Sequence, residues 1–180
     1  MALRAKETLD AFVNAIITNK EIMDILKLPT ILETDSEATK RKKRKMAIDK
    51  VIVKSSQEPA DLAKEMPPVK IDGVEYKGFG KIRMAICFAQ SIKMSSELFG
   101  NPQIDIDIFY DNTTEMDNTF VLIDLISNLF SGQKLKIDVG EEKQIIRDIK
   151  NEVITSQVSI INNYERIGMR FSFYATLYKN

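Results

Sequence analysis

The stretch from Asn101 to Gly132, NPQIDIDIFYDNTTEMDNTFVLIDLISNLFSG, contains a strand, a turn and a helix that residue types alone reveal. Ile104, Ile106 and Ile108 alternate with Asp105 and Asp107. A period of two places the isoleucines on one face of a strand and the carboxylates on the other. The pattern predicts a half-buried strand, with its apolar face in the core.

A helix is expected after this strand ends at Asp111. Thr113 or Thr114 can accept hydrogen bonds from free amides of the first turn, and Glu115 favours the positive end of the helix dipole. Gly132 suits the left-handed conformation that ends a helix. The residues expected on its apolar side are Met116, Phe120, Leu122, Ile123, Ile126, Leu129 and Phe130. We therefore predict a helix that begins near Thr114 and lies on the sheet.

Charge is segregated along the chain. The Asn101–Gly132 stretch contains no Lys or Arg, and its carboxylates are Asp105, Asp107, Asp111, Glu115, Asp117 and Asp124. An unbroken basic run lies upstream and consists of Lys40, Arg41, Lys42, Lys43, Arg44 and Lys45. Because the whole chain has 26 basic and 26 acidic residues, its zero net charge hides this polarity.

The composition fits one soluble domain. The 180 residues suffice for a single core, and the 44% hydrophobic and 29% charged content is ordinary for a globular protein. The amino terminus lacks the hydrophobic segment of a signal peptide, and no apolar run approaches the roughly 20 residues that span a bilayer. We expect a protein that is made and used in a cytoplasm, without membrane contact.

Several catalytic chemistries are excluded by residue type. The chain has no histidine, so it can form no Ser-His-Asp triad, Cys-His pair or histidine-ligated zinc site. Its single cysteine, Cys87, allows no internal disulfide and is expected to be an ordinary strand residue. Neither a P-loop nor a GxGxxG turn is present. We expect no enzymatic activity, no cofactor and no metal.

The remaining sequence predicts an α+β domain over residues 1–180. Apolar spacing indicates a first helix with Leu9, Phe12, Val13, Ile16 and Ile17 inward, and Asn19 can cap a second short helix. Residues 30–80 are expected to form a basic, proline-containing insertion or arm. Within it, Asp35 and Ser36 can start a helix through the basic run, whose second half fits a helix or a strand equally well. Asp72-Gly73 can form a hairpin turn.

Further strands are expected downstream. Ile82 to Ala89 alternates like a strand and should run antiparallel to Ile104–Tyr110, and Leu135 and Ile137 indicate another short strand. Residues 141–150 are expected to form a short helix or a connection. Two β-rich runs, Ile154–Ile161 and Met169–Tyr178, predict a hairpin with residues 162–168 as its loop. The elements together indicate a mostly antiparallel or mixed sheet with helices on one face.

Three groups of residues are candidates for function. Asp105 and Asp107 have the i, i+2 spacing of a magnesium site, although alternation alone also requires polar residues there. The basic run, Lys40 to Lys45, can contact phosphates, form salt bridges with acidic neighbours, or be a solvated helix face. Tyr174, Thr176 and Tyr178 share one face of the last strand, where a neighbouring subunit can pack.

Three segments of the chain resemble the tail terminator, or tail completion, proteins of tailed bacteriophages and phage-derived contractile particles. They are the opening helix LDAFVNAIITNKEIMDIL, the strand IDIDIFYD followed by a helix that ends in NLFSG, and the final strand RFSFYATLY. The resemblance covers about 1–28 and 81–178. The longer excursion over residues 30–80 is also compatible with a related neck, connector or tail-tube component.

The resemblance implies a structural virion protein and no catalysis. It implies a homohexameric ring that caps the tail tube and joins the tail to the neck, with tail tube, sheath and connector proteins as partners. DNA would pass through the ring with transient contact or none. Assembly would take place in the bacterial host cytoplasm. In such a ring an acidic surface with Asp105 and Asp107 can meet a basic surface of the next subunit. The alternative from another class is a DNA-binding accessory protein that uses residues 40–45.

Overall fold

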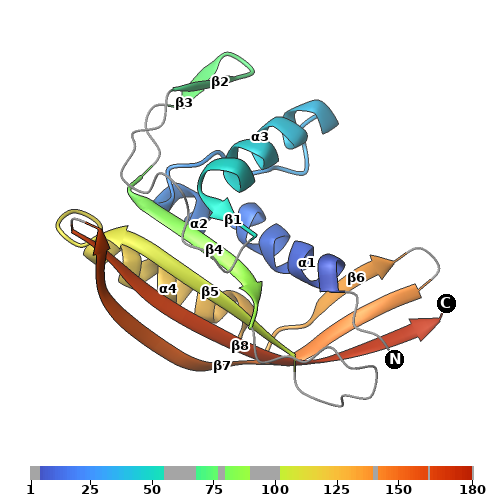
Figure 1. The fold of residues 1–180 in the computed structure, drawn as a ribbon. Helices are drawn as coiled ribbons and strands as arrows, with labels where there is room; N and C mark the ends of the chain where they lie inside the picture. The colour runs from blue at the N-terminus through green and yellow to red at the C-terminus, as the bar shows by residue number, and fades with distance from the viewer. Residues whose placement is uncertain are drawn as a thin grey trace.

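The computed structural model describes residues 5–54, 68–76, 80–89, 102–139, 142–161 and 163–179. Among these residues the first three helices precede five strands, and a fourth helix then precedes the last three strands (Figure 1). The elements are α1 (Ala5–Thr18), α2 (Lys20–Ile25), α3 (Glu37–Lys50), β1 (Ile52–Val53), β2 (Val69–Ile71), β3 (Val74–Tyr76), β4 (Ile82–Phe88), β5 (Gln103–Asp111), α4 (Met116–Phe130), β6 (Leu135–Val139), β7 (Glu142–Ile161) and β8 (Tyr164–Lys179).

The main sheet has the strand order β1-β4-β5-β8-β7-β6. Only the short β1 is parallel to its neighbour, and the other pairings are antiparallel. Figure 1 shows a curled sheet whose longest part is the β7–β8 hairpin. The predicted α+β class, with a mostly antiparallel mixed sheet, is confirmed.

The strand β5 lies at the centre of this sheet, as its alternation predicts. Ile104, Ile106 and Ile108 are completely buried and belong to the main hydrophobic core. Ile106 is opposite Ile86 of β4 on one side and Met169 of β8 on the other. The predicted antiparallel pairing of β4 with β5 is therefore correct.

The helices and the sheet share one core through an aromatic cluster. The Phe12 ring of α1 lies 4.6 Å from the Phe130 ring of α4, centroid to centroid, and 5.6 Å from Phe173 of β8. Phe130 also meets Phe171 edge to face at 5.4 Å. Rings at these distances add about 0.5–1.5 kcal/mol per pair beyond the burial of their apolar area. Segments far apart in sequence are thus joined at one point.

The predicted caps of α2 and α3 are confirmed. The Asn19 side chain accepts a hydrogen bond from the Ile22 amide at 3.1 Å, and the Ser36 hydroxyl accepts one from the Thr39 amide at 3.1 Å. The second half of this segment could have been a helix or a strand. α3 continues through Lys50, and only the short β1 after it is a strand. The predicted hairpin at Asp72-Gly73 is also present, and both of its turn residues have positive φ.

The short helix or connection predicted over residues 141–150 is wrong, because residues 142–150 are part of β7. Gln144 and Ile146 are buried on the core face, but the next buried residue is Ile149. A register shift between Arg147 and Lys150, with Asp148 at φ 54°, moves the core-facing positions from even to odd numbers. This bulge produces a three-residue spacing that imitates a helix.

The predicted loop at residues 162–168 is too long. β8 already begins at Tyr164, which is opposite Asp111 of β5, and Ile167 is buried opposite Ile108. Asn163, at φ 67°, occupies the turn. From Tyr164 onward the predicted loop is strand, and its Glu165 and Arg166 side chains bond to Tyr110 and Asp107 of β5.

The start of α4 also differs from the prediction. The helix begins at Met116, and neither Thr113 nor Thr114 caps it. Instead the Asp111 carboxylate accepts hydrogen bonds from the Thr113 amide at 2.9 Å and the Thr113 hydroxyl at 2.5 Å. At the other end Gly132 has the expected positive φ of 71°.

The apolar side of α4 is narrower than predicted. Its buried residues are Thr119, Leu122, Ile123, Ile126 and Phe130. Met116 and Phe120, which were expected on this side, are 45% and 52% exposed. The helix therefore presents apolar side chains to solvent as well as to the core.

Parts of the predicted insertion fall outside the described residues. These are the proline-rich segment 55–67 and residues 77–79. Within the described part, α3 packs on β1 and β2. Across all the residues that the structure describes, no helix is both long and apolar enough to cross a membrane.

Candidate functional site

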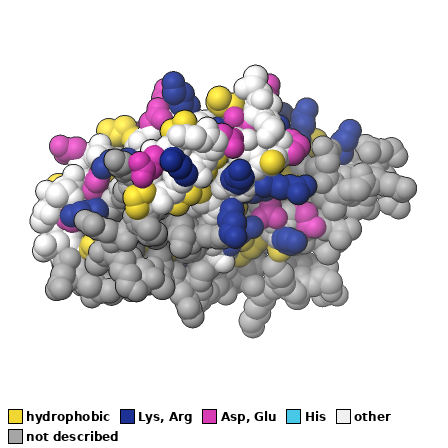
Figure 2. Space-filling model, turned by 90° about the horizontal axis from the view of Figure 1, so that it is seen from above, with side chains coloured by type: hydrophobic (Ala, Val, Ile, Leu, Met, Phe, Trp, Pro, Cys, Tyr) yellow, Lys and Arg dark blue, Asp and Glu magenta, His cyan; other side chains and the backbone are white. Residues whose placement is uncertain are grey.

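All six residues of the basic run, Lys40 to Lys45, lie on α3, and they point in different directions around the helix. Lys43 faces inward and is only 9% exposed, whereas Arg41 and Lys45 lie on the opposite side. Consecutive helical residues are separated by about 100°, so six adjacent cations cannot form one stripe. Figure 2 shows basic and acidic side chains interspersed over the face seen from above.

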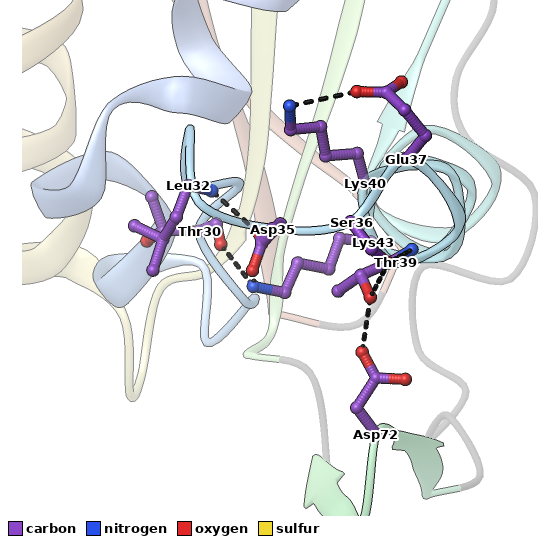
Figure 3. A network of polar contacts seen from close by, with 9 residues as sticks. All are labelled: Thr30, Leu32, Asp35, Ser36, Glu37, Thr39, Lys40, Lys43 and Asp72. Atoms are coloured by element: carbon purple, nitrogen blue, oxygen red, sulfur yellow. Dashed lines mark hydrogen bonds and ion pairs between the residues drawn. The ribbon is translucent and has the colours of Figure 1, made fainter.

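Lys43 holds the loop that precedes α3. Its ammonium group donates to the Thr30 carbonyl at 2.9 Å and to the Asp35 carboxylate at 2.8 Å (Figure 3). Asp35 also accepts from the Leu32 amide at 2.8 Å. The hydrogen bond from Lys43 is the main reason that the pKa of Asp35 is lowered. This member of the basic run is therefore structural.

The β2–β3 hairpin is attached to α3 through one carboxylate. The Thr39 hydroxyl donates to Asp72 at 2.6 Å (Figure 3), and Lys42 lies 3.6 Å from the other oxygen of the same group. The hydrogen bond from Thr39 lowers the pKa of Asp72. A second cation of the run thus has a partner within the chain.

Two more basic side chains have polar partners. Lys40 lies 3.0 Å from Glu37, and Arg44 donates to the Asn14 side chain of α1. Arg41 and Lys45 are exposed, and neither forms an ion pair with a described residue. Of the three interpretations of the run, salt bridging fits three of its residues, Lys40, Lys42 and Lys43. Arg44 is bonded to a neutral amide, and a solvated surface fits Arg41 and Lys45.

Two carboxylates of β5, Asp105 and Asp107, are neutralised by the neighbouring strand β8. Asp105 accepts two hydrogen bonds from Arg170, at 2.7 and 2.8 Å, in the two-point geometry that arginine favours with a carboxylate. Asp107 accepts from Arg166 at 2.7 Å. The Arg166 guanidinium also lies 5.9 Å from the Phe109 ring centroid. Both acidic positions are matched by cations that the sequence places about sixty residues away.

Two further carboxylates of the Asn101–Gly132 stretch are paired at the start of α4. Asp111 accepts from Lys81 at 2.8 Å, and this bond is the largest of the effects that lower its pKa to about 2. Glu115, buried at the first turn, lies 3.6 Å from Lys27. These pairs show that most of the acidity is compensated within the chain and does not require a partner molecule.

The metal hypothesis for Asp105 and Asp107 is weakened by these contacts. Both side chains share a strand face, as predicted, but their oxygens are bonded to guanidinium groups. Burial raises the pKa of Asp107 although Arg166 donates to it. Among the residues that the structure describes, no three His, Cys, Asp or Glu side chains form a metal-binding group. Cys87 lies on β4 as expected, and burial raises the pKa of its thiol to about 11.

The tyrosine face of β8 is described only in part. Tyr174 is 50% exposed, in agreement with a surface position. Thr176 and Tyr178 pair through their backbones with Ile145 and Lys143 of β7, but their side chains lie outside what the structure describes. Their role in an interface remains a prediction.

An exposed surface on α4 was missed by the sequence interpretation. Phe120 and Val121 are each 52% exposed, and Met116 is 45% exposed. Asp117 and Asp124 are exposed on the same helix, and neither forms an ion pair with a described residue. The sequence does contain a sign of this surface. Val121 lies four residues after Asp117 and three before Asp124, so it falls on the polar side of the helix.

Comparisons with known proteins provide no family for this chain. No protein-family model matches the sequence, and no curated protein matches it either. The function must therefore be inferred from the geometry of the molecule and from the sequence.

Proposed function

We propose that this chain is a non-enzymatic structural protein of a phage-like particle, a tail terminator that caps the tail tube and joins it to the neck. The observation that carries the proposal is the aromatic cluster of Phe12, Phe130, Phe171 and Phe173. It unites the opening helix, the strand-and-helix unit and the final strand, which are the three segments that resemble tail terminators. Their juxtaposition in one core supports a single structural unit.

The distribution of charge also supports an assembly protein. The carboxylates of β5 are bonded to β8, and the basic helix is largely bonded to its own chain. The surfaces that remain are apolar and charged helix faces, which suit contact with other proteins. The expected partners are further copies of the chain and tube, sheath and connector proteins of the particle. A related neck or tube component would use the same surfaces.

A DNA-binding accessory protein is the weaker alternative. The basic helix was its main support, but Lys40, Lys42 and Lys43 are paired with carboxylates. Few cations are then left to contact phosphates. A fluorescence anisotropy titration with duplex DNA at two salt concentrations tests the alternative. Salt-sensitive binding that is lost on neutralising Arg41 and Lys45 would favour it over the structural role.

The proposed function is tested by assembly. The purified chain should form rings in mass photometry and negative-stain images, alone or on the ends of tail tubes assembled from a phage tube protein. Caps located at one end of the tubes, together with an arrest of tube growth, are the expected result. A dispersed monomer that binds neither tubes nor connector proteins would contradict the proposal.

A further inference from the structure

The exposed face of α4 has the composition of a protein contact. We use "acidic α4 surface" for Met116, Asp117, Phe120, Val121 and Asp124. Met116 and Phe120 are four residues apart, as are Phe120 and Asp124, so the side chains are neighbours on the helix. Three large apolar groups about half exposed, flanked by two carboxylates, are unusual for a face that meets only water.

The outward face of α3 carries the opposite charge. We use "basic α3 surface" for Arg41 and Lys45, which are four residues apart and therefore adjacent on the helix. Lys43, on the other side of α3, is buried, so these two cations point away from the protein. The hairpin attached beside them through Asp72 exposes the apolar side chain of Val74 by 55%.

The two surfaces belong to different parts of the molecule. α4 packs on β5 and β7 and against α1 and α2, whereas α3 packs on β1 and β2. Figure 1 shows α3 beside the β2–β3 hairpin and α4 apart from both. Both surfaces are exposed to solvent in the folded chain, so they are available to another molecule.

We propose that the acidic α4 surface of one copy binds the basic α3 surface of a second copy. This contact rests on the proposed function, because it would join the subunits of the proposed ring. Asp117 and Asp124 lie about 10 Å apart along the helix, and the long side chains of Arg41 and Lys45 can reach both. Phe120 and Val121 supply the apolar centre of the contact. Because two different surfaces meet, the contact is head to tail and closes into a ring when the rotation allows.

Charge reversal provides the test. One variant carries Asp117→Lys and Asp124→Lys, and the other carries Arg41→Glu and Lys45→Glu. Each alone brings like charges together, and we expect its association constant in sedimentation velocity to fall by about 100-fold or more. An equimolar mixture restores unlike charges at every contact. It should therefore assemble again, with the two variants alternating and an even number of copies in each ring.

Matched controls separate this contact from a general effect of charge. Lys20→Glu with Lys134→Glu, and Asp24→Lys with Glu33→Lys, make the same changes in net charge at exposed positions elsewhere. They should assemble like the wild type. A variant with Phe120→Ser and Val121→Ser should assemble less than the wild type while its circular dichroism spectrum is unchanged.

The outcomes distinguish the contact from the proposed function. Rings formed equally well by both reversed variants would exclude the α4–α3 contact while still supporting a ring protein. A mixture that stays dissociated would exclude it as well. A wild-type chain that remains monomeric in isolation would also overturn the contact, and the proposed function would then be judged by binding to tube ends.

Discussion

Asp111 links the end of β5 to the start of α4 by accepting bonds from Lys81 and Thr113. Its pKa of about 2 in the folded protein is below the ordinary value of 3.8. A carboxyl group whose folded pKa is lowered stabilises the fold above its unfolded pKa, and this contribution is lost as the pH falls through the folded pKa. The Asp111 carboxylate should therefore contribute its full stabilisation of the fold above about pH 4, and this stabilisation should be lost as the pH falls toward 2.

We expect Asp111→Asn to lower the free energy of unfolding by about 1 kcal/mol at pH 7, because a charge-assisted acceptor is removed. The difference from the wild type should shrink between pH 4 and pH 2. Urea unfolding at several pH values measures it. Asp117→Asn, at an exposed position, is the control and should change stability by less than about 0.5 kcal/mol. A difference independent of pH would contradict the role given to the carboxylate.

Asp107 behaves in the opposite way, since burial raises its pKa. Removing Arg166 leaves this carboxylate buried without its cation. We expect Arg166→Met to destabilise the fold by about 2 kcal/mol at pH 7, less than for a fully buried pair because the Arg166 side chain is 34% exposed. Because the pKa of Asp107 is raised in the folded protein, the fold favours the protonated carboxyl group. Its contribution to stability is fully present below pH 3.8 and is lost as the pH rises through the folded pKa.

The destabilisation by Arg166→Met should therefore be smaller at pH 3 than at pH 7 in chemical unfolding experiments. Combining it with Asp107→Asn removes the buried charge and should recover much of the loss. If the double variant is as unstable as Arg166→Met alone, Arg166 contributes through its packing on Phe109 and not through the ion pair.

At the scale of elements, α4 has two aromatic residues with different roles. Phe130 is completely buried between Phe12 and Phe171, whereas Phe120 is 52% exposed. We expect Phe130→Ala to cost about 3–5 kcal/mol through lost burial and the cavity that remains. Phe120→Ala should change stability by less than about 0.5 kcal/mol.

Thermal or urea unfolding of the two variants, at a protein concentration that keeps the chain monomeric, compares them without a contribution from contacts between copies. The substitution is the same and the helix is the same, so helix propensity cancels in the comparison. A similar loss for both variants would show that the exposed face of α4 is covered by its own chain in solution. That result would also remove the acidic α4 surface as a contact for another copy.

The bulge in β7 shows why an element can be misassigned. Ile146 and Ile149 both face the core, and in sequence their spacing is typical of a helix. The pairing partner of this segment is β8, whose strand character is clear from its own alternation. Only that partner reveals that Asp148, at φ 54°, is an extra strand residue.

At the scale of the whole molecule, the charges show the largest difference between expectation and structure. The cations that neutralise Asp105 and Asp107 lie about sixty residues downstream, so no local pattern connects them. The antiparallel register places Arg170 opposite Asp105 in β8. The same register brings Arg166 within bonding distance of Asp107, although the residue opposite Asp107 is Gly168. The acidity of β5 is consequently an internal feature of the sheet.

Local chemistry along the chain was sufficient for the α+β class, the caps at Asn19 and Ser36, the turn at Asp72-Gly73 and the strand-and-helix unit of β5 and α4, because each depends on neighbours a few residues away. Long-range packing was needed for the course of β7, the partners of the carboxylates and the exposed face of α4. Those features depend on which distant segments pack against each other. The residues that form such a contact lie far apart in the sequence, so neither segment alone shows a pattern that predicts it.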